Sequence, residues 1–433
     1  MDTSNYRKST YAHIKKRLRL YRVLRISLMN LFLVGFSFAY LLIIPGAAGA
    51  VTLEFWHPWP HAERTVRNLS REYTRETGVV VRVRAVSPSS YHPWTARNAP
   101  DLIGLSHPTK RNVEELARAG RAYNISSEMG HGWYSRFWPG MLETFRISRA
   151  SPTGVYGVPL TGQVHMFVYN KTAFAKAGIS RPPATWSELM RCSRLLHKVG
   201  VTPYAGGFSS RQPPLAYVYE WSYMGIHNLA QTYFSHHPYT STDWVRQLGL
   251  YPEMRSHGFT DAKWASMSET SAAKAMLDGR VAMVFIGPSF ESVRRAYKPQ
   301  FMSWGLFGGP MDGRARFLPR LPGSVVEGLV VNRRSNRKVE AIKFARWLTD
   351  PARQVAFANG ASSIPATPAA SSSPELHSHL RAFASGMRDQ AIDLRVYEQP
   401  EALDTLYAGV RRMLGGSNTP SAVAQSVQRV KRK

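Results

Sequence analysis

The spacing of apolar and polar residues predicts helices and strands that alternate along the chain. Residues 61–77 place apolar side chains at helical spacing between charged ones, and Gly78 follows as a left-handed cap. Residues 79–86 alternate apolar side chains with arginine, which is typical of a strand with one buried face. Repeated alternation of this kind favours layered α/β domains built on mostly parallel sheets.

The same alternation continues further along. The short apolar run APDLIGL at residues 99–105 is of the kind buried in a parallel sheet, and residues 111–119 form the next helical pattern. Thr185 and Glu188 have the spacing of a capping box at the start of a helix over residues 186–199.

Later segments extend the pattern to the C-terminus. Residues 281–286 predict a buried strand between a helix that ends at residue 279 and one that starts near Ser289. Residues 369–374 are small and predict a linker, beyond which the chain is helical up to the basic tail at residues 429–433.

The first 50 residues differ in composition from the rest. Eight lysine and arginine residues precede an uncharged apolar run over residues 26–44, and Ala48, Gly49 and Ala50 follow it. This order is that of a signal peptide cleaved after Ala50. An uncleaved membrane anchor is the alternative, because the apolar run is nearly long enough to span a bilayer. Either way, we expect the remainder to be exported.

The chain is strongly basic. It has 56 lysine and arginine residues against 28 aspartate and glutamate residues, and residues 51–433 alone carry a net charge of +21. Such a charge raises nucleic acid or an anionic membrane as a partner. No nucleic-acid-binding motif accompanies it, so we expect no nucleic-acid partner. An anionic ligand and an acidic environment that favours a positive surface remain as explanations.

Cysteine usage excludes two kinds of site. Cys192 is the only cysteine, so the chain has no intrachain disulfide and no cysteine-rich metal site. It falls at a core-facing position of the helix over residues 186–199, and we expect an inert, packed thiol. A lipid-modified cysteine after the apolar run is absent as well. We expect no metal and no other cofactor.

Five segments, in order along the chain, carry a resemblance to a known family. The longest is residues 154–199, where GVYGVPLTGQVHMFVYN is followed by KTAFAKAGISRPPATWSELMRCSRLLHKV. The others are VTLEFWHPW at 51–59, APDLIGL at 99–105, MLDGRVAMVFIGPSF at 276–290 and EGLVVNRRSNRKVEAIKFARWLTDPARQVAFANGASSIPA at 327–366. Together they resemble the family 1 extracellular solute-binding proteins of ABC importers, which include binders of maltodextrins and glycerol-phosphate compounds.

The resemblance implies a periplasmic-binding-protein fold of type II. In this α/β fold, two lobes, each a mostly parallel sheet flanked by helices, enclose a ligand cleft at a hinge. Residues 51–162 and 323–370 would form lobe 1, and residues 163–322 would form lobe 2. Residues 371–433 would add C-terminal helices that pack on lobe 2.

The resemblance also implies a function. An exported substrate-binding subunit, periplasmic or otherwise extracytoplasmic, would capture a carbohydrate and deliver it to the permease subunits of an ABC importer. A binder of an anionic small molecule, such as a glycerol phosphodiester, a sugar phosphate or a uronate, is the alternative that the positive charge favours. A membrane-tethered sensor or adaptor is a third possibility, which an uncleaved N-terminal segment would permit. Membrane contact is expected only through that segment or the permease.

Candidate ligand contacts begin at the end of the first exported strand. Sugar sites combine aromatic faces with planar hydrogen-bonding side chains, placed where strands end at a cleft. Trp56, His57 and Trp59 lie at such a strand end. Since both tryptophans stand beside prolines, we expect that they cannot both be buried without strain and that one faces the cleft.

Gln163 stands where the resembled maltodextrin binders carry a carboxylate that hydrogen-bonds sugar hydroxyls, and an amide can still donate and accept. Ser289 and Phe290 follow Gly-Pro, where many relatives place a stacking tryptophan. Ser289 at a helix N-terminus would suit an anion, while Phe290 is equally expected in the core.

Four further residues are candidates. Trp221 is a replacement platform for stacking, or a core residue on an apolar helix. Arg211, in a loop, would match a carboxylate or phosphate if it points inward. Asp101 and Glu327 follow turns at strand starts, and Glu327 is alternatively a hinge residue.

Catalytic signatures are missing from the sequence. It contains no G-x-S-x-G elbow, no H-E-x-x-H motif, no P-loop and no cysteine nucleophile with a local signature. We therefore expect a binding protein rather than an enzyme.

Overall fold

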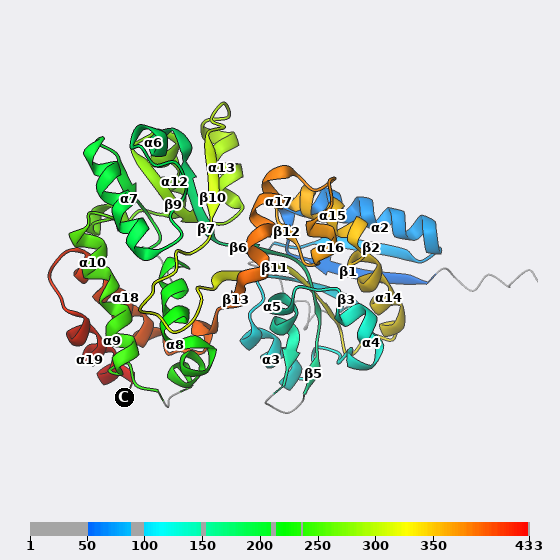
Figure 1. Cartoon of the computed structure of the whole chain (residues 1–433). Helices are drawn as coiled ribbons and strands as arrows, with labels where there is room; N and C mark the ends of the chain where they lie inside the picture. Colours follow the sequence, from blue (N-terminus) through cyan, green and yellow to red (C-terminus); the bar gives the residue numbers. More distant parts are fainter. Residues whose placement is uncertain (1–50, 88–98, 149–152, 209–213, 235–236, 432–433) are drawn as a thin grey trace, which may run out of the picture. The chain divides into compact units, whose positions relative to one another are not determined.

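The computed structural model describes residues 51–87, 99–148, 153–208, 214–234 and 237–431 (Figure 1). The chain divides into two units, Met1–Val51 and Thr52–Lys433, and every described helix and strand lies in the second. The predicted signal or anchor segment lies outside the described residues. Within these ranges, no helix is both long and apolar enough to cross a membrane.

A seven-stranded sheet organises the first lobe, in the order β12-β6-β11-β3-β1-β2 with β13 paired to β11. β1 runs parallel to β2 and β3, whereas β11 runs antiparallel to β3 and β6. The sheet is therefore mixed rather than mostly parallel, because β11 returns along its two neighbours. Its strands are β1 (Thr52–His57), β2 (Val80–Ala85), β3 (Leu102–Ser106), β6 (Val158–Val164), β11 (Leu321–Val331), β12 (Ile364–Pro365) and β13 (Gln390–Ile392).

Helices pack around this sheet: α2 contacts β2, α14 contacts β11, and α15 contacts α2 and β6. A small hairpin of β4 (Arg146–Ile147) and β5 (Gly154–Val155) lies apart from it. The helices are η1 (Pro60–Ala62), α2 (Glu63–Thr77), α3 (Lys110–Arg118), α4 (Ser126–Tyr134), α5 (Pro139–Leu142), η3 (Glu143–Phe145), α14 (Lys338–Leu348), α15 (Pro351–Ala361), α16 (Pro368–Ser371), α17 (Ser378–Ala384) and η4 (Ser385–Asp389).

A four-stranded sheet organises the second lobe, in the order β10-β7-β9-β8. Only β8 and β9 pair in parallel; β7 is antiparallel to both β9 and β10, so this sheet is mixed as well. Its strands are β7 (Met166–Asn170), β8 (Thr202–Tyr204), β9 (Val281–Ile286) and β10 (Trp304–Phe307).

The helices of this lobe include α7 and α12, which contact β8 and β9. They are α6 (Lys171–Lys176), α7 (Trp186–Lys198), α8 (Pro214–Tyr233), α9 (Thr242–Leu248), α10 (Leu250–Ser256), α11 (Ala262–Ala265), α12 (Glu269–Leu277), α13 (Ser289–Tyr297), η5 (Leu394–Tyr397), α18 (Pro400–Leu414) and α19 (Pro420–Lys431).

Residues 371–433, which the sequence places on lobe 2, contact both lobes. α17 and η4 contact β12, β6 and β11 of the first sheet, whereas α18 and α19 contact α9, α10 and α11. The predicted linker at 369–374 contains the helix α16, which Thr367 caps through a hydrogen bond from Ala370 N. Small residues there pack closely rather than forming an open connection.

The chain passes between the two sheets at points that lie side by side. β6 belongs to the first sheet and β7 to the second, so His165 marks one crossing. The chain returns between β10 and β11, and His165 N donates to the Pro322 carbonyl at 2.9 Å. These adjacent crossings position the candidate site.

Local signals in the sequence are confirmed where they set helix ends. Gly78 caps α2 with φ 74°, and Thr185 with Glu188 forms the predicted capping box of α7. Cys192 is buried on α7, as expected. The φ of Gly78 lies in the region that a Cβ disfavours.

We predict that Gly78→Ala lowers the free energy of unfolding by about 1 kcal/mol, because only backbone strain opposes the methyl group. A Cβ at Gly78 would meet no atom within 4 Å. Gly132→Ala, an equally open site inside α4, is the control and should be neutral or stabilising. Urea unfolding of residues 51–433 measures both; equal shifts would contradict the account.

Candidate functional site

A pocket of about 260 Å³ lies where the strands of the first sheet meet the crossings. Its wall is formed by residues from the loop after β3, from η3, from β6 and β11, and from the starts of α8 and η5. The lining comprises His107, Pro108, Thr109, Lys110, Thr144, Gln163, His165, Pro214, Pro322, Gly323, Ser324, Val325, Asp393, Arg395 and Val396. Because these segments are distant in sequence, only the tertiary fold assembles the pocket.

Gln163 is the sequence-predicted residue that lines this pocket. Its Nε2 donates to Ser324 Oγ at 3.2 Å, which links β6 to β11. Its Oε1 points toward the turn before α13, since a Cβ on Gly287 would lie 3.6 Å from it. The Gln163 amide therefore lies between the two lobes, with the Ser324 hydroxyl beside its Nε2.

Asp393 and Arg395 form a hydrogen-bonded ion pair in the pocket wall. Arg395 is 1% exposed, and its Nε and Nη2 donate to Asp393 Oδ1 and Oδ2 at 2.9 and 2.6 Å. Its Nη1 donates to Tyr407 at 3.1 Å, and the guanidinium lies 4.7 Å from the ring centroid of Tyr217. The Asp393 carboxylate is thus held in one orientation, as a fixed acceptor at the pocket wall.

A second buried acid supports this group from behind. Tyr407 Oη donates to Glu220 Oε1 at 2.7 Å, and Tyr233 Oη donates to Oε2 at 3.1 Å. Burial raises the pKa of Glu220. The network joins α8, η5 and α18 next to the pocket, so the side chains that would contact a ligand there are held by well-packed neighbours.

Other cationic side chains of the pocket face carboxylates. Lys110 Nζ bonds Glu143, and His165 Nε2 lies 3.5 Å from Glu269 Oε1. Arg395 is bound to Asp393 in the same way, so each of these three cations has a carboxylate beside it and together they create little net positive potential that would attract an anion.

The backbone of His107 is unusual, because its φ of 46° lies in the left-handed region that few non-glycine residues adopt.

Both tryptophans near the end of β1 are buried, so the expectation that one of them faces the cleft is wrong. Trp59 Nε1 donates to the Leu105 carbonyl at 3.2 Å. Trp56 is 8% exposed, and the Arg84 guanidinium lies 4.4 Å from its ring centroid. Both tryptophans can be buried because η1 begins at Pro60 and turns the chain tightly, which directs Trp59 back into the core.

His57 is part of the same buried aromatic group. Its ring stacks on Trp59, with centroids 5.1 Å apart. Nδ1 accepts from Trp59 N at 3.2 Å, which places the proton of the neutral ring on Nε2. Burial lowers the pKa of His57 to about 4. The residue does not line the pocket.

The two predicted carboxylates serve the framework. Asp101 accepts from Glu54 N at 2.9 Å and from Ser335 Oγ at 2.6 Å, which ties β1 to the segment after β11. Glu327 is fully buried, accepts from Thr161 Oγ1 and lies 2.9 Å from His61 Nε2. This hydrogen bond raises the pKa of His61. Neither carboxylate lines the pocket.

The remaining candidates lie elsewhere. Phe290 is fully buried and meets Trp304 edge-on, 5.3 Å between centroids. Ser289 is exposed at the start of α13, and Trp221 is half-buried beside Tyr217. Arg211 lies outside the described residues.

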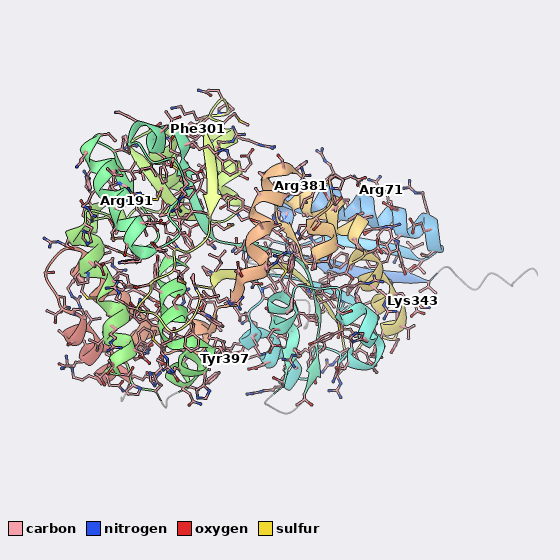
Figure 2. The ribbon with its side chains drawn as sticks, viewed as in Figure 1. Arg71, Arg191, Phe301, Lys343, Arg381 and Tyr397 are labelled. Carbon is pink, nitrogen blue, oxygen red and sulfur yellow. The ribbon has the colours of Figure 1, made fainter. Side chains whose placement is uncertain are left out.

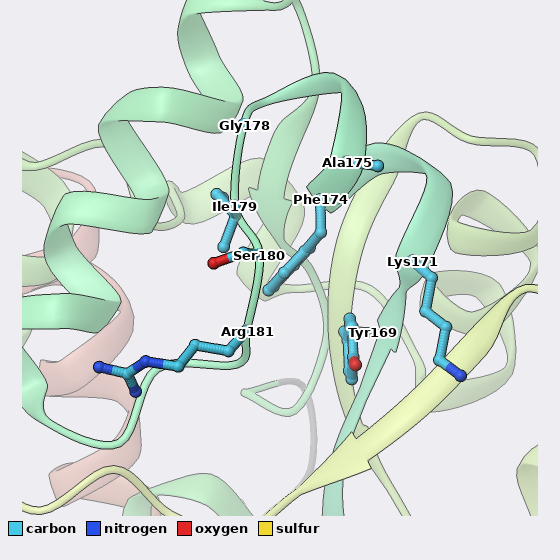
Figure 3. A pocket seen from close by; sticks show the side chains of 8 residues that line it. All are labelled: Tyr169, Lys171, Phe174, Ala175, Gly178, Ile179, Ser180 and Arg181. Atoms are coloured by element: carbon cyan, nitrogen blue, oxygen red, sulfur yellow. The ribbon is translucent and has the colours of Figure 1, made fainter.

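A larger hollow, of about 570 Å³, lies on the second lobe around α6 (Figure 3). The end of β7 and residues 171–181 line it, and Figure 3 shows Lys171 and Arg181 on opposite sides of Tyr169 and Phe174. Arg181 is paired with Glu188 at 2.5 Å. One continuous chain segment forms this hollow, so it lacks the convergence of segments that marks the first pocket.

No sequence signal pointed to Asp393 and Arg395. The pair sits in a stretch that was predicted as helical, whereas Asp393 caps the short η5 by accepting from Arg395 N at 2.9 Å. Within the described ranges, no cluster of histidine, cysteine or acidic residues could hold a metal ion.

The two sheets and the pocket at their crossings define a binding protein with two lobes. Residues 61–355 match the bacterial extracellular solute-binding proteins, and the chain belongs to that family.

Known relatives share part of the sequence. The multiple sugar-binding protein of Streptococcus mutans is 24% identical over 193 residues, which cover 42% of this chain and 40% of the relative. A binding protein of Brucella abortus is 24% identical over 240 residues, which cover 54% and 55%. The chain thus spans about half the length of these curated relatives.

Solved structures share the fold over most of the chain. A family 1 extracellular solute-binding protein from Bifidobacterium longum subsp. infantis has a TM-score of 0.71 at 16% identity, covering 88% of this chain and 99% of that one. The sugar-binding protein MalE from Xanthomonas citri has a TM-score of 0.70 at 20% identity, covering 88% and 96%. The two-lobed α/β fold predicted from the sequence is confirmed.

We predict that acid destabilises the fold partly through His57. The imidazole titrates near 6.5 in the unfolded chain and near 4 in the folded protein. Its contribution is complete above pH 6.5 and is lost as the pH falls toward 4, in total about 3 kcal/mol of unfolding free energy. His57→Asn should flatten the change in stability between pH 6.5 and 4, measured by urea unfolding.

His131→Asn is the control, because His131 is exposed and its removal should leave the wild-type slope. An unchanged slope in His57→Asn would show that His57 does not carry this pH dependence.

Proposed function

We propose that this protein is the exported substrate-binding subunit of an ABC importer and that it captures a carbohydrate for delivery to the membrane permease. The observation that carries the proposal is the pocket at the crossings, whose charged groups compensate one another while Asp393, Gln163 and Ser324 offer hydrogen-bonding atoms. A neutral polyol fits such a lining, because it supplies hydroxyl donors and acceptors without charge. The sugar-binding names of the relatives support the same class of ligand.

The proposed contacts divide between the lobes. Ser324 and Gln163 lie on strands of the first sheet, while Asp393 belongs to the segment that leads to α18. A ligand that bonds both sides would favour a closed arrangement over an open one. We propose this closed form as the one that the permease recognises.

An anionic small molecule is the second candidate. The exposed Ser289 at the N-terminus of α13 favours it, since the positive end of a helix dipole attracts anions and the hydroxyl can donate a hydrogen bond. Ser289 lies two residues after Gly287, which approaches the Gln163 amide. The net charge of +21 on residues 51–433 also favours an anionic ligand.

A thermal-shift screen of residues 51–433 against neutral oligosaccharides, uronates and glycerol phosphates tests the proposal. A ligand at 100 times its Kd stabilises the folded state by about 2.7 kcal/mol, which is a readily visible shift. We expect shifts with neutral sugars that persist in 0.5 M salt. Shifts with anions alone, lost in salt, would replace the carbohydrate by an anionic ligand, and no shift with any sugar would contradict the proposal.

For the sugar so identified, we predict that Asp393→Asn weakens binding at least tenfold, because a hydrogen bond to a fixed carboxylate is lost. Gln163→Ala should weaken it less. Isothermal titration measures both, and thermal unfolding checks that each variant is folded. Asp389→Asn is the matched control, because this exposed carboxylate only lies 3.8 Å from Arg320. Equal affinity in Asp393→Asn and wild type would remove Asp393 from the site.

A further inference from the structure

Basic side chains, most of them exposed, gather at one end of the first sheet. β11 ends at Val331, which pairs with Leu102 at the start of β3, and Leu102 pairs in turn with Phe55 of β1. The segment that follows, residues 333–346, has six basic residues and one acidic residue. Arg121 joins them, since Arg333 N donates to its carbonyl at 2.9 Å. We call this cluster the basic end: Arg121, Arg333, Arg334, Lys338, Lys343 and Arg346.

Charge at the basic end is not compensated as it is in the pocket. Three carboxylates are near: Asp101, Glu128 and Glu340. Asp101 is buried, held by the hydrogen bonds that tie β1 to Ser335, and Arg337 lies 3.9 Å from it. Glu128 accepts from the hydroxyls of Tyr123 and Ser127 at 2.8 and 2.7 Å.

Two arginines and one lysine of the basic end have no acidic partner among the described residues. In the part of the chain that the structure describes, Arg333, Arg334 and Lys343 are exposed and form no ion pair. Figure 2 shows Lys343 on the outer side of α14. No carboxylate of the described residues neutralises these three charges, so they are accessible to an external anion.

An exposed apolar side chain stands among them. Val339 is 57% exposed in the first turn of α14, and the 3.6-residue period of the helix places it on one face with Lys343 and Arg346. Apolar side chains beside lysine and arginine on one helix face are typical of contact with a lipid headgroup region.

The start of β1 lies at the same end. One strand separates β1 from β11, which places Phe55 roughly 10 Å from Val331 across the sheet. Thr52 begins β1 three residues earlier, so the start of β1 extends beyond the end of β11 on this side. The apolar run of the sequence ends at residue 44, and seven residues can span at most about 25 Å. If that run lies in a membrane, the bilayer surface is within this distance of Val51.

We propose that the basic end docks on an anionic phospholipid surface. Lysine and arginine side chains would bind headgroup phosphates, and Val339 would lie at the level of the headgroups. The pocket would face away from the lipid, because His107 and Lys110 follow β3 at its opposite end. The lipid surface would thus orient the protein without covering its binding site.

Vesicle co-sedimentation of residues 51–433 tests the proposal, since this part carries both complete sheets and the described core. Binding to vesicles of 70% phosphatidylcholine and 30% phosphatidylglycerol should exceed binding to pure phosphatidylcholine and fall between 50 and 300 mM salt. Arg333→Gln/Arg334→Gln/Lys343→Gln should bind at least tenfold more weakly. All three side chains are exposed, so folding is preserved.

The matched control removes the same charge from the second lobe: Arg191→Gln/Lys198→Gln/Arg412→Gln, at three exposed positions. It should bind within twofold of wild type. Equal loss in both variants would assign binding to overall charge and overturn the proposal. Absence of binding to anionic vesicles at 50 mM salt would also overturn it and leave an acidic protein surface as the partner.

A depth probe gives an independent readout. Cys192 is buried, so a polarity-sensitive dye can be attached selectively to Val339→Cys. Its emission should shift to the blue on anionic vesicles, whereas dye on Lys198→Cys should not respond. The same response at both positions, or at neither, would contradict docking through the basic end.

Discussion

The antiparallel pairing of β6 with β11 is the constraint on which the pocket depends. The two strands carry the chain out of the first sheet and back into it, and the hydrogen bond from His165 N to the Pro322 carbonyl holds the crossings together. Gln163 and Ser324 face one another because of this register. Crossings that lie side by side are also the geometry that a hinge between two lobes requires. Glu327 secures the pairing from within, through Thr161 on β6 and His61 on η1.

Buried polar groups fix the floor of the pocket in the same way. Arg395, Asp393, Glu220 and Tyr407 satisfy one another, and they join η5 and α18 to the helix α8, which is distant in sequence. Removing one partner from such a network leaves a buried charge without compensation and costs about 3–5 kcal/mol. The network is therefore a source of rigidity, and it explains why a carboxylate can be presented to a ligand in one orientation.

The large positive charge has different roles in different places. Inside the pocket, cations are matched by carboxylates, so the charge of the whole chain does not identify the ligand. At the surface the excess cannot be matched, because residues 51–433 have 48 basic residues and only 27 acidic ones. Six of these basic side chains lie together at the basic end, so part of the excess charge faces one direction. A protein held by that end would keep its pocket exposed to solvent.

The sequence by itself determined the features that depend on residues close to one another. The Gly78 cap, the capping box of Thr185, the buried strand at 281–286 and the α/β class were all predictable, since they rest on periodicity and local hydrogen bonds. Tertiary structure alone decided that Trp59 is buried, that Glu327 bonds Thr161 across 166 residues, and that Asp393 lines the pocket. It also decided that both sheets are mixed, because strand direction depends on which distant segments pair. A pocket built by six segments has no local signature, because each wall residue acquires its role only from the others.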